Sequence, residues 1–301
     1  MQRRIAVLAM VAASWAVCSG MCVAQGNRQV PSIEPTYADV AYGDHKQQRI
    51  DIYLADSSRP TPLVLFIHGG GFRAGSKRAV NPKPFLDAGI SLAAIEYRFV
   101  QDAPLPAAHQ DCCRALQFLR YHAEKYNFDK TRVGAFGGSA GAQLSMYLAF
   151  HDDLADPDAE DPIARESTRL ICVATTGGQT SMDLNWWKNN IPGYDRPHRD
   201  VTEIFGRVSR ERLREIVEDI SALSLLSEDD PPIFMSYGMS PGAPIPQGAR
   251  AQGWKVHHVN FGIALKKKAD ALGVEAYLQY PGAKTKYASQ TAFLISKLKG
   301  E

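Results

Sequence analysis

Residues 132–141 read Arg-Val-Gly-Ala-Phe-Gly-Gly-Ser-Ala-Gly, and the rest of the fold has to be consistent with this stretch. Residues 132–136 predict a buried strand, and the apolar run at residues 140–150 predicts a helix. Between them stands Gly-x-Ser-x-Gly, with Ser139 at its centre. A sharp strand-to-helix turn needs small neighbours, and it lifts the serine hydroxyl above the sheet at the helix N-terminus. We interpret Ser139 as a nucleophile; the alternative is a purely structural turn.

A second glycine-rich segment, His68-Gly69-Gly70-Gly71-Phe72, directly follows the apolar run at residues 62–67. Successive glycines let backbone amides approach a developing oxyanion, and each such donor contributes roughly 3 kcal/mol to acyl transfer. We expect the amides of Gly70, Gly71 and Ala140 to form an oxyanion hole. The alternative is a turn that binds nothing. Because His68 precedes the serine in the chain, we expect it to make structural hydrogen bonds rather than to act as a base.

Strand and helix patterns alternate along the chain. Apolar or alternating runs predict strands at residues 49–54, 62–67, 91–96, 132–136, 170–175, 232–237 and 274–280, and helical patterns occupy residues 104–126, 140–150, 259–272 and 289–298. This order predicts an α/β fold with a mostly parallel central sheet and helices on both faces. Ligands in such folds bind outside the carboxyl ends of the strands.

Two segments interrupt this alternation. Residues 151–162 are acidic and rich in turn-forming residues, but they lack the regular oxygen-ligand spacing of a calcium loop, so we expect a solvated loop. Residues 178–225 form a long segment with Trp186-Trp187 and a charged helical pattern at residues 209–219. We predict that this second segment is a cap-like insertion that shapes access to the site.

The first 24 residues have the pattern of a secretory signal peptide, with Arg3-Arg4, an apolar run at residues 5–18 and a small-residue stretch that ends at Ala24. The alternative is an anchoring helix, but the run is short for a bilayer, and no later segment reaches ~18 consecutive apolar residues. We therefore expect an exported protein, periplasmic or extracellular, whose mature chain is a single domain over residues 25–301 without a membrane span.

Composition limits the classes of partner. The chain has 34 basic and 32 acidic residues, and loss of Arg3 and Arg4 with the leader leaves 32 against 32. A neutral balance gives no sign of a nucleic-acid or anionic-membrane partner. Cys112, Cys113 and Cys172 follow the leader; this odd number allows at most one bridge, to Cys172, and its spacing does not resemble a metal site. We expect no metal and no cofactor.

Three motifs together resemble a known family. They are HGGGF at residues 68–72, Tyr97-Arg98 after the next predicted strand, and GGSAG at residues 137–141. The combination resembles the hormone-sensitive-lipase and acetyl-esterase branch of the α/β-hydrolases. It is also similar to the bacterial carbohydrate-esterase-like group that includes feruloyl and acetylxylan esterases. The resemblance implies an α/β-hydrolase fold, Ser139 as nucleophile, and an oxyanion hole formed by Gly70, Gly71 and Ala140.

Both triad partners are missing from the positions that this resemblance implies. The family order is serine, acid, histidine. The acid should follow the strand at residues 232–237, but residues 237–246 contain no carboxylate. The histidine should follow the last strand, where Thr285 stands instead. Asp229 and Asp230 precede their strand, and about six residues at roughly 3.3 Å each place them some 20 Å from its carboxyl edge, so we expect them to be turn residues.

The histidines after Ser139 are the remaining candidates for a base. His151 lies near the far end of the predicted helix, roughly 17 Å from Ser139 at 1.5 Å per residue, which argues against it. His198 falls in the predicted cap. His258 and His257 follow the strand at residues 232–237 and are our candidate bases, with surface or helix-entry positions as the alternative.

Lysine is a further alternative for the base, because Lys284 and Lys286 stand beside the position where the family has its histidine. A solvated lysine is mostly protonated near neutral pH, so only strong desolvation would make either side chain useful.

Two hypotheses follow from these observations. The first is a serine carboxylic-ester hydrolase that acts on a short acyl or aryl ester, including carbohydrate-linked ones, through an acyl-Ser139 intermediate. The second is a catalytically impaired relative that binds a carbohydrate or an ester-like ligand. Loss of triad members can cost up to about 10⁶-fold in rate. An imidazole nitrogen within about 4 Å of the Ser139 oxygen would favour the first hypothesis.

Overall fold

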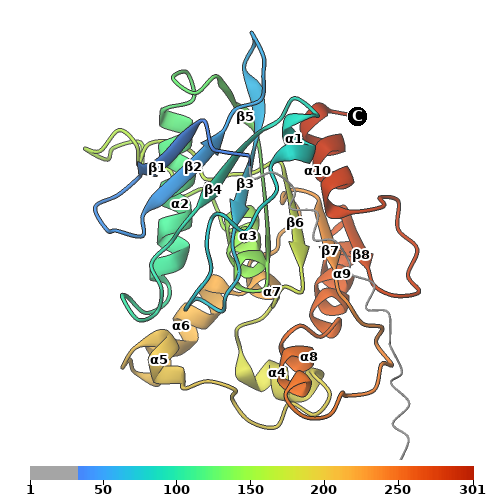
Figure 1. Ribbon diagram of the computed structural model, residues 1–301. Coiled ribbons are helices and arrows are strands. Elements are labelled where there is room, and N and C mark those ends of the chain that lie inside the picture. Colours follow the sequence, from blue (N-terminus) through green and yellow to red (C-terminus); the bar gives the residue numbers. More distant parts are fainter. Residues whose placement is uncertain (1–32) are drawn as a thin grey trace, which may run out of the picture. The chain divides into compact units, whose positions relative to one another are not determined.

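The computed structural model describes residues 33–301 and contains one eight-stranded sheet. The strands are β1 (Tyr37–Ala41), β2 (Arg49–Tyr53), β3 (Thr61–Ile67), β4 (Ser91–Ile95), β5 (Phe128–Gly138), β6 (Cys172–Thr176), β7 (Ile233–Ser236) and β8 (Ala276–Gln279). Their order is β1-β2-β4-β3-β5-β6-β7-β8 (Figure 1). The pairs β1–β2 and β2–β4 are antiparallel, and all later pairs are parallel. The predicted α/β fold is confirmed.

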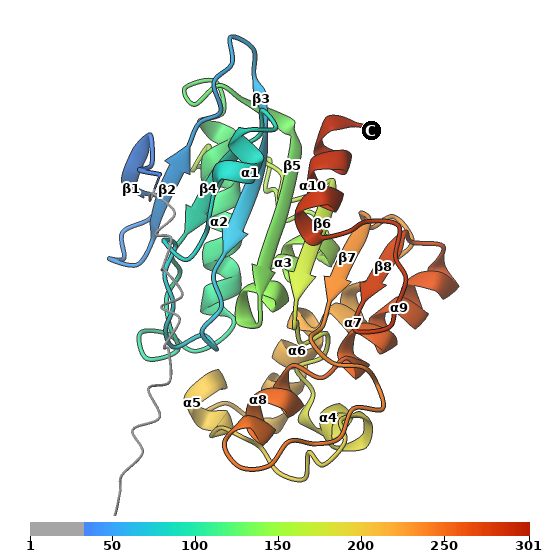
Figure 2. The same cartoon turned by 45° about the vertical axis from the view of Figure 1, so that its right-hand side comes forward.

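Helices cover both faces of the sheet (Figure 2). They are α1 (Lys83–Leu86), α2 (Ala107–Tyr121), α3 (Ala140–Phe150), α4 (Leu184–Asn190), α5 (Val201–Phe205), α6 (Arg210–Ile220), α7 (Ala222–Leu225), α8 (Arg250–Val256), α9 (Asn260–Leu272) and α10 (Gln290–Lys299). Alternate residues of β3 enter two separate apolar clusters. Leu65 belongs to the cluster that includes residues of α2, α3 and α9, and Val64 belongs to the cluster that includes residues of α1 and α10. A strand buried on both faces needs the continuous apolar run seen in the sequence.

Some elements differ from the expectations from sequence. Strand β1 was not expected, because four of its five residues are exposed and it lies at an antiparallel edge, so its sequence lacks an apolar pattern. Strand β5 begins earlier than predicted, at Phe128. The short helices α4, α5, α7 and α8 were also not expected, since each has fewer than eight residues and buries few of them.

The cysteine bridge left open by the sequence is not formed. Cys112, Cys113 and Cys172 are all free thiols. Cys112 and Cys113 belong to the cluster on one face of the sheet, and Cys172 belongs to the cluster on the other face. The sheet itself therefore separates the thiols that a disulfide would have to join.

The predicted signal peptide at residues 1–24 lies outside the described residues. Within residues 33–301, none of the helices combines the length and the apolar character needed to cross a bilayer.

The first turn of α3 packs directly on the carboxyl end of β3. Ile67 of β3 stands opposite Gly137 of β5 in the parallel register, so the segments after these strands start side by side. A methyl group built on Gly137 or on Gly141 would overlap the carbonyl oxygen of Ile67. Glycine at both positions therefore lets the helix start against the neighbouring strand, which brings residues 68–72 beside Ser139.

This packing predicts that Gly141→Ala destabilises the fold. The added methyl would meet the backbone oxygens of Ile67 and His68, which cannot rotate away, so we expect the free energy of unfolding to fall by about 1–3 kcal/mol. Urea denaturation followed by circular dichroism measures the change. Gly238→Ala is the matched control, because no heavy atom lies within 4 Å of a methyl group at that position. Equal stability of the two variants would contradict the packing argument.

Candidate active site

Ser139 lies at a strained turn between β5 and α3. Its backbone has φ 53° and ψ −118°, a conformation that L-residues rarely adopt. Two hydrogen bonds hold the turn: the Ser139 amide donates to the Thr176 carbonyl at 2.9 Å, and the Gln143 amide donates to the Ser139 carbonyl at 3.0 Å. The side chain is half-buried and lines a pocket at the carboxyl end of the sheet. This is the geometry expected of a nucleophile elbow.

The segment at residues 68–72 runs beside this turn. A methyl group built on Gly69 would lie 3.6 Å from Cβ of Ser139. Gly70 and Gly71 have φ values of +111° and +61°, which favour glycine. The Gly70 carbonyl accepts hydrogen bonds from the amides of Arg73 and Ala74, each at 3.2 Å, and these bonds fix the orientation of the peptide that carries the Gly71 amide.

The three backbone amides that the sequence predicts for an oxyanion hole have no hydrogen-bond acceptor in the described part of the chain. Among the described residues, the amides of Gly70, Gly71 and Ala140 donate to no protein acceptor. The Ala140 amide is left over at the N-terminus of α3, where the first helical amides have no intrahelical partner. Gly71, Ser139 and Ala140 line the same pocket. Gly70 is not among the lining residues of this pocket, and the role of all three amides in an oxyanion hole stays a prediction.

His68 is buried and holds the glycine-rich loop through its side-chain and backbone contacts. Its Nδ1 lies 2.7 Å from the Gly69 carbonyl oxygen, and its Nε2 lies 2.9 Å from a carboxylate oxygen of Glu96. The ring stacks on Tyr97, whose hydroxyl donates to the His68 carbonyl at 2.9 Å. Burial alone would raise the pKa of Glu96, but hydrogen bonds from His68 and the Lys77 amide outweigh it and lower that pKa. These contacts are the structural role expected for His68.

His257 is the histidine that reaches Ser139. Its Nε2 lies 2.9 Å from the Ser139 hydroxyl oxygen, well inside the limit of about 4 Å that favours catalysis. The residue follows the last turn of α8 and arrives from the connection between β7 and α9, not from the segment after β8. The structure brings one of the two candidate bases to the Ser139 hydroxyl.

The second ring nitrogen of His257 bonds to the backbone. Nδ1 lies 2.8 Å from the carbonyl oxygen of Gly253, one turn earlier in α8. A carbonyl oxygen only accepts, so Nδ1 carries the proton and Nε2 presents its lone pair to the Ser139 hydroxyl. This is the tautomer that a general base requires. Among residues 33–301, no carboxylate forms an ion pair with His257, so a carbonyl stands where a triad has its acid.

The other histidines lie elsewhere. His258 is fully buried, its Nδ1 accepts from the Asn260 amide at 3.1 Å, and its ring packs edge-on against Trp254, so it does not reach Ser139. Burial lowers the pKa of its imidazole. His151 lies at the end of α3, as expected, and its Nε2 lies 3.2 Å from Asp219.

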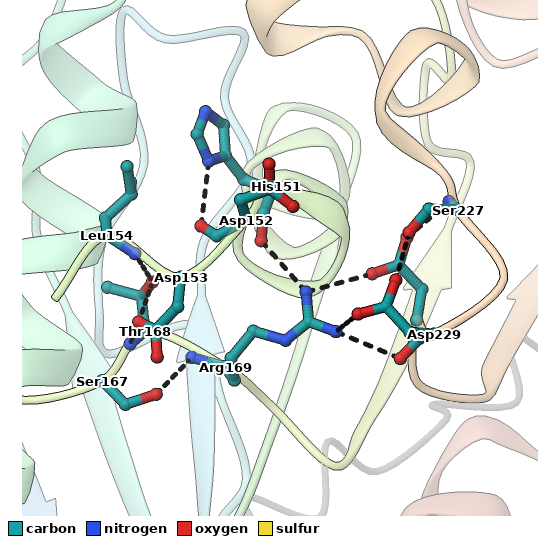
Figure 3. A network of polar contacts seen from close by, with 10 residues as sticks. His151, Asp152, Asp153, Leu154, Ser167, Thr168, Arg169, Ser227 and Asp229 are labelled. Atoms are coloured by element: carbon teal, nitrogen blue, oxygen red, sulfur yellow. Dashed lines mark hydrogen bonds and ion pairs between the residues drawn. The ribbon is translucent and has the colours of Figure 1, made fainter.

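The carboxylates at residues 229 and 230 form a network remote from the pocket-lining residues. Arg169 donates to Asp229 at 3.0 Å and to Asp230 at 3.3 Å, and it also contacts the carbonyl of His151 (Figure 3). These residues precede β7, whereas Ser139 lies at the carboxyl end of the sheet. The expectation that both are turn residues omitted this ion-pair network, in which Asp230 is buried.

The positions at which the family has its acid and histidine hold other groups. Residues 238–246, which follow β7, contain no carboxylate. The Thr285 hydroxyl, at the position of the family's histidine, donates to the Tyr287 carbonyl at 2.9 Å. Within residues 33–301, no group of three or more histidine, cysteine or acidic side chains is arranged to hold a metal ion.

Residues 178–225 form much of the pocket wall. This segment contains α4 to α7, and its side chains surround the opening beside Ser139. The contributing residues are Gln179, Met182, Leu184, Trp187, Tyr194, Pro197, His198, Arg199, Val201, Ile204 and Phe205. Most of this wall is apolar. The segment is also tied to the glycine-rich loop, because Arg73 pairs with Glu203 at 2.7 Å and Arg199 donates to the Gly71 carbonyl.

His198 is neutral in this wall. Its ring stacks on Trp187 with centroids 5.3 Å apart, and its Nδ1 lies 3.0 Å from the Tyr194 hydroxyl. Burial, and then the positive charge of Arg199, lower its pKa from the ordinary 6.5 to about 4.

Comparison with known proteins places these features in a family. The chain matches the BD-FAE family over residues 50–247. Esterase LipC of Mycobacterium tuberculosis is 24% identical over 213 residues, which cover 66% of this chain and 49% of that protein. A probable isoprenylcysteine alpha-carbonyl methylesterase of Arabidopsis thaliana, ICMEL1, is 25% identical over 48% of this chain. The chain spans only 31%, 26% and 35% of the length of three such plant methylesterases.

Solved structures share the fold. A truncated carbohydrate esterase from gut microbiota has a TM-score of 0.68 at 21% identity, covering 88% of this chain and 96% of that chain. An acetyl ester-xyloside bifunctional hydrolase from Caldicellulosiruptor lactoaceticus has a TM-score of 0.61 at 24% identity, covering 91% and 90%. At these identities the likeness establishes the α/β-hydrolase fold.

Because His198 is neutral in the folded protein, we predict that the stability of the fold decreases in acid. The unfolded chain binds this proton near pH 6.5, and the folded chain binds it only near pH 4, so the unfolded state holds more protons in between. The contribution of His198 to stability is therefore present above pH 6.5 and is lost as the pH falls towards 4. Urea denaturation across this range should show a smaller loss in His198→Asn than in wild type, and the imidazole should titrate near pH 4 by NMR. Equal pH dependence in both proteins would contradict the assignment.

Proposed function

Because this chain belongs to the BD-FAE esterase family, we propose that it is a serine carboxylic-ester hydrolase that uses Ser139 and His257 as a catalytic dyad. The observation that carries the proposal is the 2.9 Å separation between the Ser139 hydroxyl oxygen and Nε2 of His257. The substrates are short acyl or aryl esters. We include carbohydrate-linked esters, since two proteins of the same fold are a carbohydrate esterase and an acetyl ester-xyloside hydrolase.

In the first half of the reaction, Nε2 of His257 accepts the hydroxyl proton as the Ser139 oxygen attacks the ester carbonyl carbon. The carbonyl oxygen becomes an oxyanion, to which the amides of Gly70, Gly71 and Ala140 donate. The tetrahedral intermediate then collapses. The bond to the alcohol oxygen breaks, and the proton on His257 passes to the leaving alcohol, which gives acyl-Ser139.

In the second half, water attacks the acyl carbon and loses its proton to Nε2 of His257. Collapse of the second intermediate releases the carboxylic acid, and the proton returns to the oxygen of Ser139. The Gly253 carbonyl keeps the imidazole in its orientation throughout. The hydrogen bond from Nδ1 to this carbonyl becomes charge-assisted when the imidazolium forms, and it stabilises that charge.

The second candidate function is ligand binding without efficient catalysis. The observation in its favour is the missing carboxylate, because a carbonyl carries only a partial charge beside the imidazolium. In serine proteases, loss of the acid alone costs on the order of 10⁴-fold in rate. The dyad keeps the correct tautomer, which is one of the two contributions of the acid, so we propose a working but slow esterase.

Two further proposals concern the whole chain. We propose that residues 178–225 act as a cap, which is supported by the many side chains that this segment contributes to the pocket. We also propose export to the periplasm or the extracellular space, which is supported by the sequence pattern of residues 1–24 alone.

Removal of either dyad member should abolish ester hydrolysis. We expect Ser139→Ala and His257→Ala each to lower kcat/KM on p-nitrophenyl acetate by at least about 10³-fold, because the hydroxyl is a weak nucleophile without its base. A fluorophosphonate probe should label the wild type, label His257→Ala slowly and leave Ser139→Ala unlabelled.

The control is His151→Ala, which changes a histidine paired with Asp219 outside the pocket and should retain wild-type rates. Circular dichroism verifies that each variant is folded. If the wild type neither reacts with the probe nor exceeds Ser139→Ala in hydrolysis, the binding function replaces the esterase.

A substitution at position 253 can supply the carboxylate that His257 lacks. Residues 253 and 257 are one helical turn apart, and no atom lies within 4 Å of a methyl group built on Gly253. A carboxylate there would stabilise the imidazolium that forms in the transition state, so Gly253→Asp should be about two- to fivefold faster than Gly253→Ala. Steady-state kinetics at low salt measures the ratio. A ratio of one or less at low salt would contradict an imidazolium at His257.

A further inference from the structure

Arg199 is the one charged group among the described residues that line the pocket with Ser139. The remaining lining residues are apolar or neutral, and no aspartate or glutamate is among them. The other basic side chain in the wall, His198, is neutral above its pKa of about 4. At neutral pH the pocket therefore holds one positive charge and no negative charge to balance it.

The guanidinium group of Arg199 has spare hydrogen-bonding capacity. One of its nitrogens donates to the carbonyl oxygen of Gly71, and this is its one hydrogen bond to the described residues. An arginine has five N–H donors, so most of them lack an acceptor. No carboxylate within residues 33–301 forms an ion pair with it. Glu203, on the next helix, is already paired with Arg73 at 2.7 Å.

The guanidinium group of Arg199 lies against the loop at residues 68–72, which supplies two amides of the proposed oxyanion hole. A methyl group built on Gly71 would overlap the guanidinium. The side chain is half-buried in a largely apolar wall that includes Phe72 and Val201. A half-buried charge without an ionic partner is costly, and a planar guanidinium is suited to hold a carboxylate through two parallel hydrogen bonds.

We infer that Arg199 recognises a carboxylate of the substrate, so that the preferred substrates are esters that carry a second, free carboxylate a few atoms from the scissile carbonyl. The inference rests on the proposed esterase function and narrows its substrate class. The carboxylate supplies the negative charge that the pocket lacks. The apolar wall accommodates the chain between the carboxylate and the ester.

A matched pair of esters tests the inference. The mono-p-nitrophenyl ester of glutaric acid and p-nitrophenyl valerate have acyl chains of equal length and differ in the terminal carboxylate. We expect the ratio of their kcat/KM values, anionic over neutral, to be about 10- to 100-fold higher in wild type than in Arg199→Gln. The ratio within one variant cancels any effect of the substitution on the oxyanion loop. Arg196→Gln, which removes an exposed arginine outside the pocket, should keep the wild-type ratio.

Two outcomes overturn the inference. If the ratio changes by less than twofold in Arg199→Gln, the side chain only holds the Gly71 carbonyl. If Arg196→Gln lowers the ratio as much as Arg199→Gln does, the effect is one of general surface charge.

A binding measurement tests carboxylate recognition by Arg199 independently of the proposed esterase activity. Monomethyl glutarate is titrated calorimetrically into the Ser139→Ala protein with and without Arg199→Gln. An at least tenfold weaker Kd in the double variant supports carboxylate recognition even if the wild type hydrolyses neither ester. Equal Kd values refute it even if the wild type is an active esterase.

Discussion

The close approach of two backbones, at Gly141 of α3 and at Ile67 of β3, is the constraint on which the site depends. It lets the helix begin directly against the neighbouring strand, with no side chain between them. The parallel register then brings two loops side by side at the carboxyl edge of the sheet. One loop presents the Ser139 hydroxyl and the other presents free amides. If a larger residue at position 141 pushed α3 outward, the Ser139 hydroxyl and the loop at residues 68–72 would move apart.

Much of the site was predictable because its signals are local. A serine between glycines after a buried strand, and three glycines after the adjacent strand, each have one simple physical use, and the parallel sheet brings them together. The base was not predictable in this way. His257 follows β7 by about 20 residues that form a loop and a short helix, and the direction of that path depends on tertiary packing. The sequence indicated both His257 and His258 as candidate bases. In the structure, of these two only His257 contacts Ser139, and His258 bonds to the Asn260 amide instead.

The pocket wall is a second part of the site that the sequence predicts only incompletely. Residues 178–225 were expected to lie near the site because they interrupt the strand–helix alternation. Their side-chain arrangement could not be expected, since α4, α5 and α7 are too short to show an amphipathic period. Stacking of His198 on Trp187 links two parts of this segment, and the contact between Arg199 and Gly71 joins residues 128 positions apart in the sequence. The charge balance of the pocket follows from these contacts, and composition alone, with nearly equal acidic and basic totals, gives no indication of it.

The bond from His257 to the Gly253 carbonyl has an evolutionary consequence. In a triad of three side chains, any of three codons can mutate and remove a functional group. Here the orienting oxygen belongs to the main chain, and every amino acid at position 253 supplies it. Substitution can displace this oxygen only by distorting α8, so the helix geometry, rather than the identity of the residue, is what selection would preserve at this position.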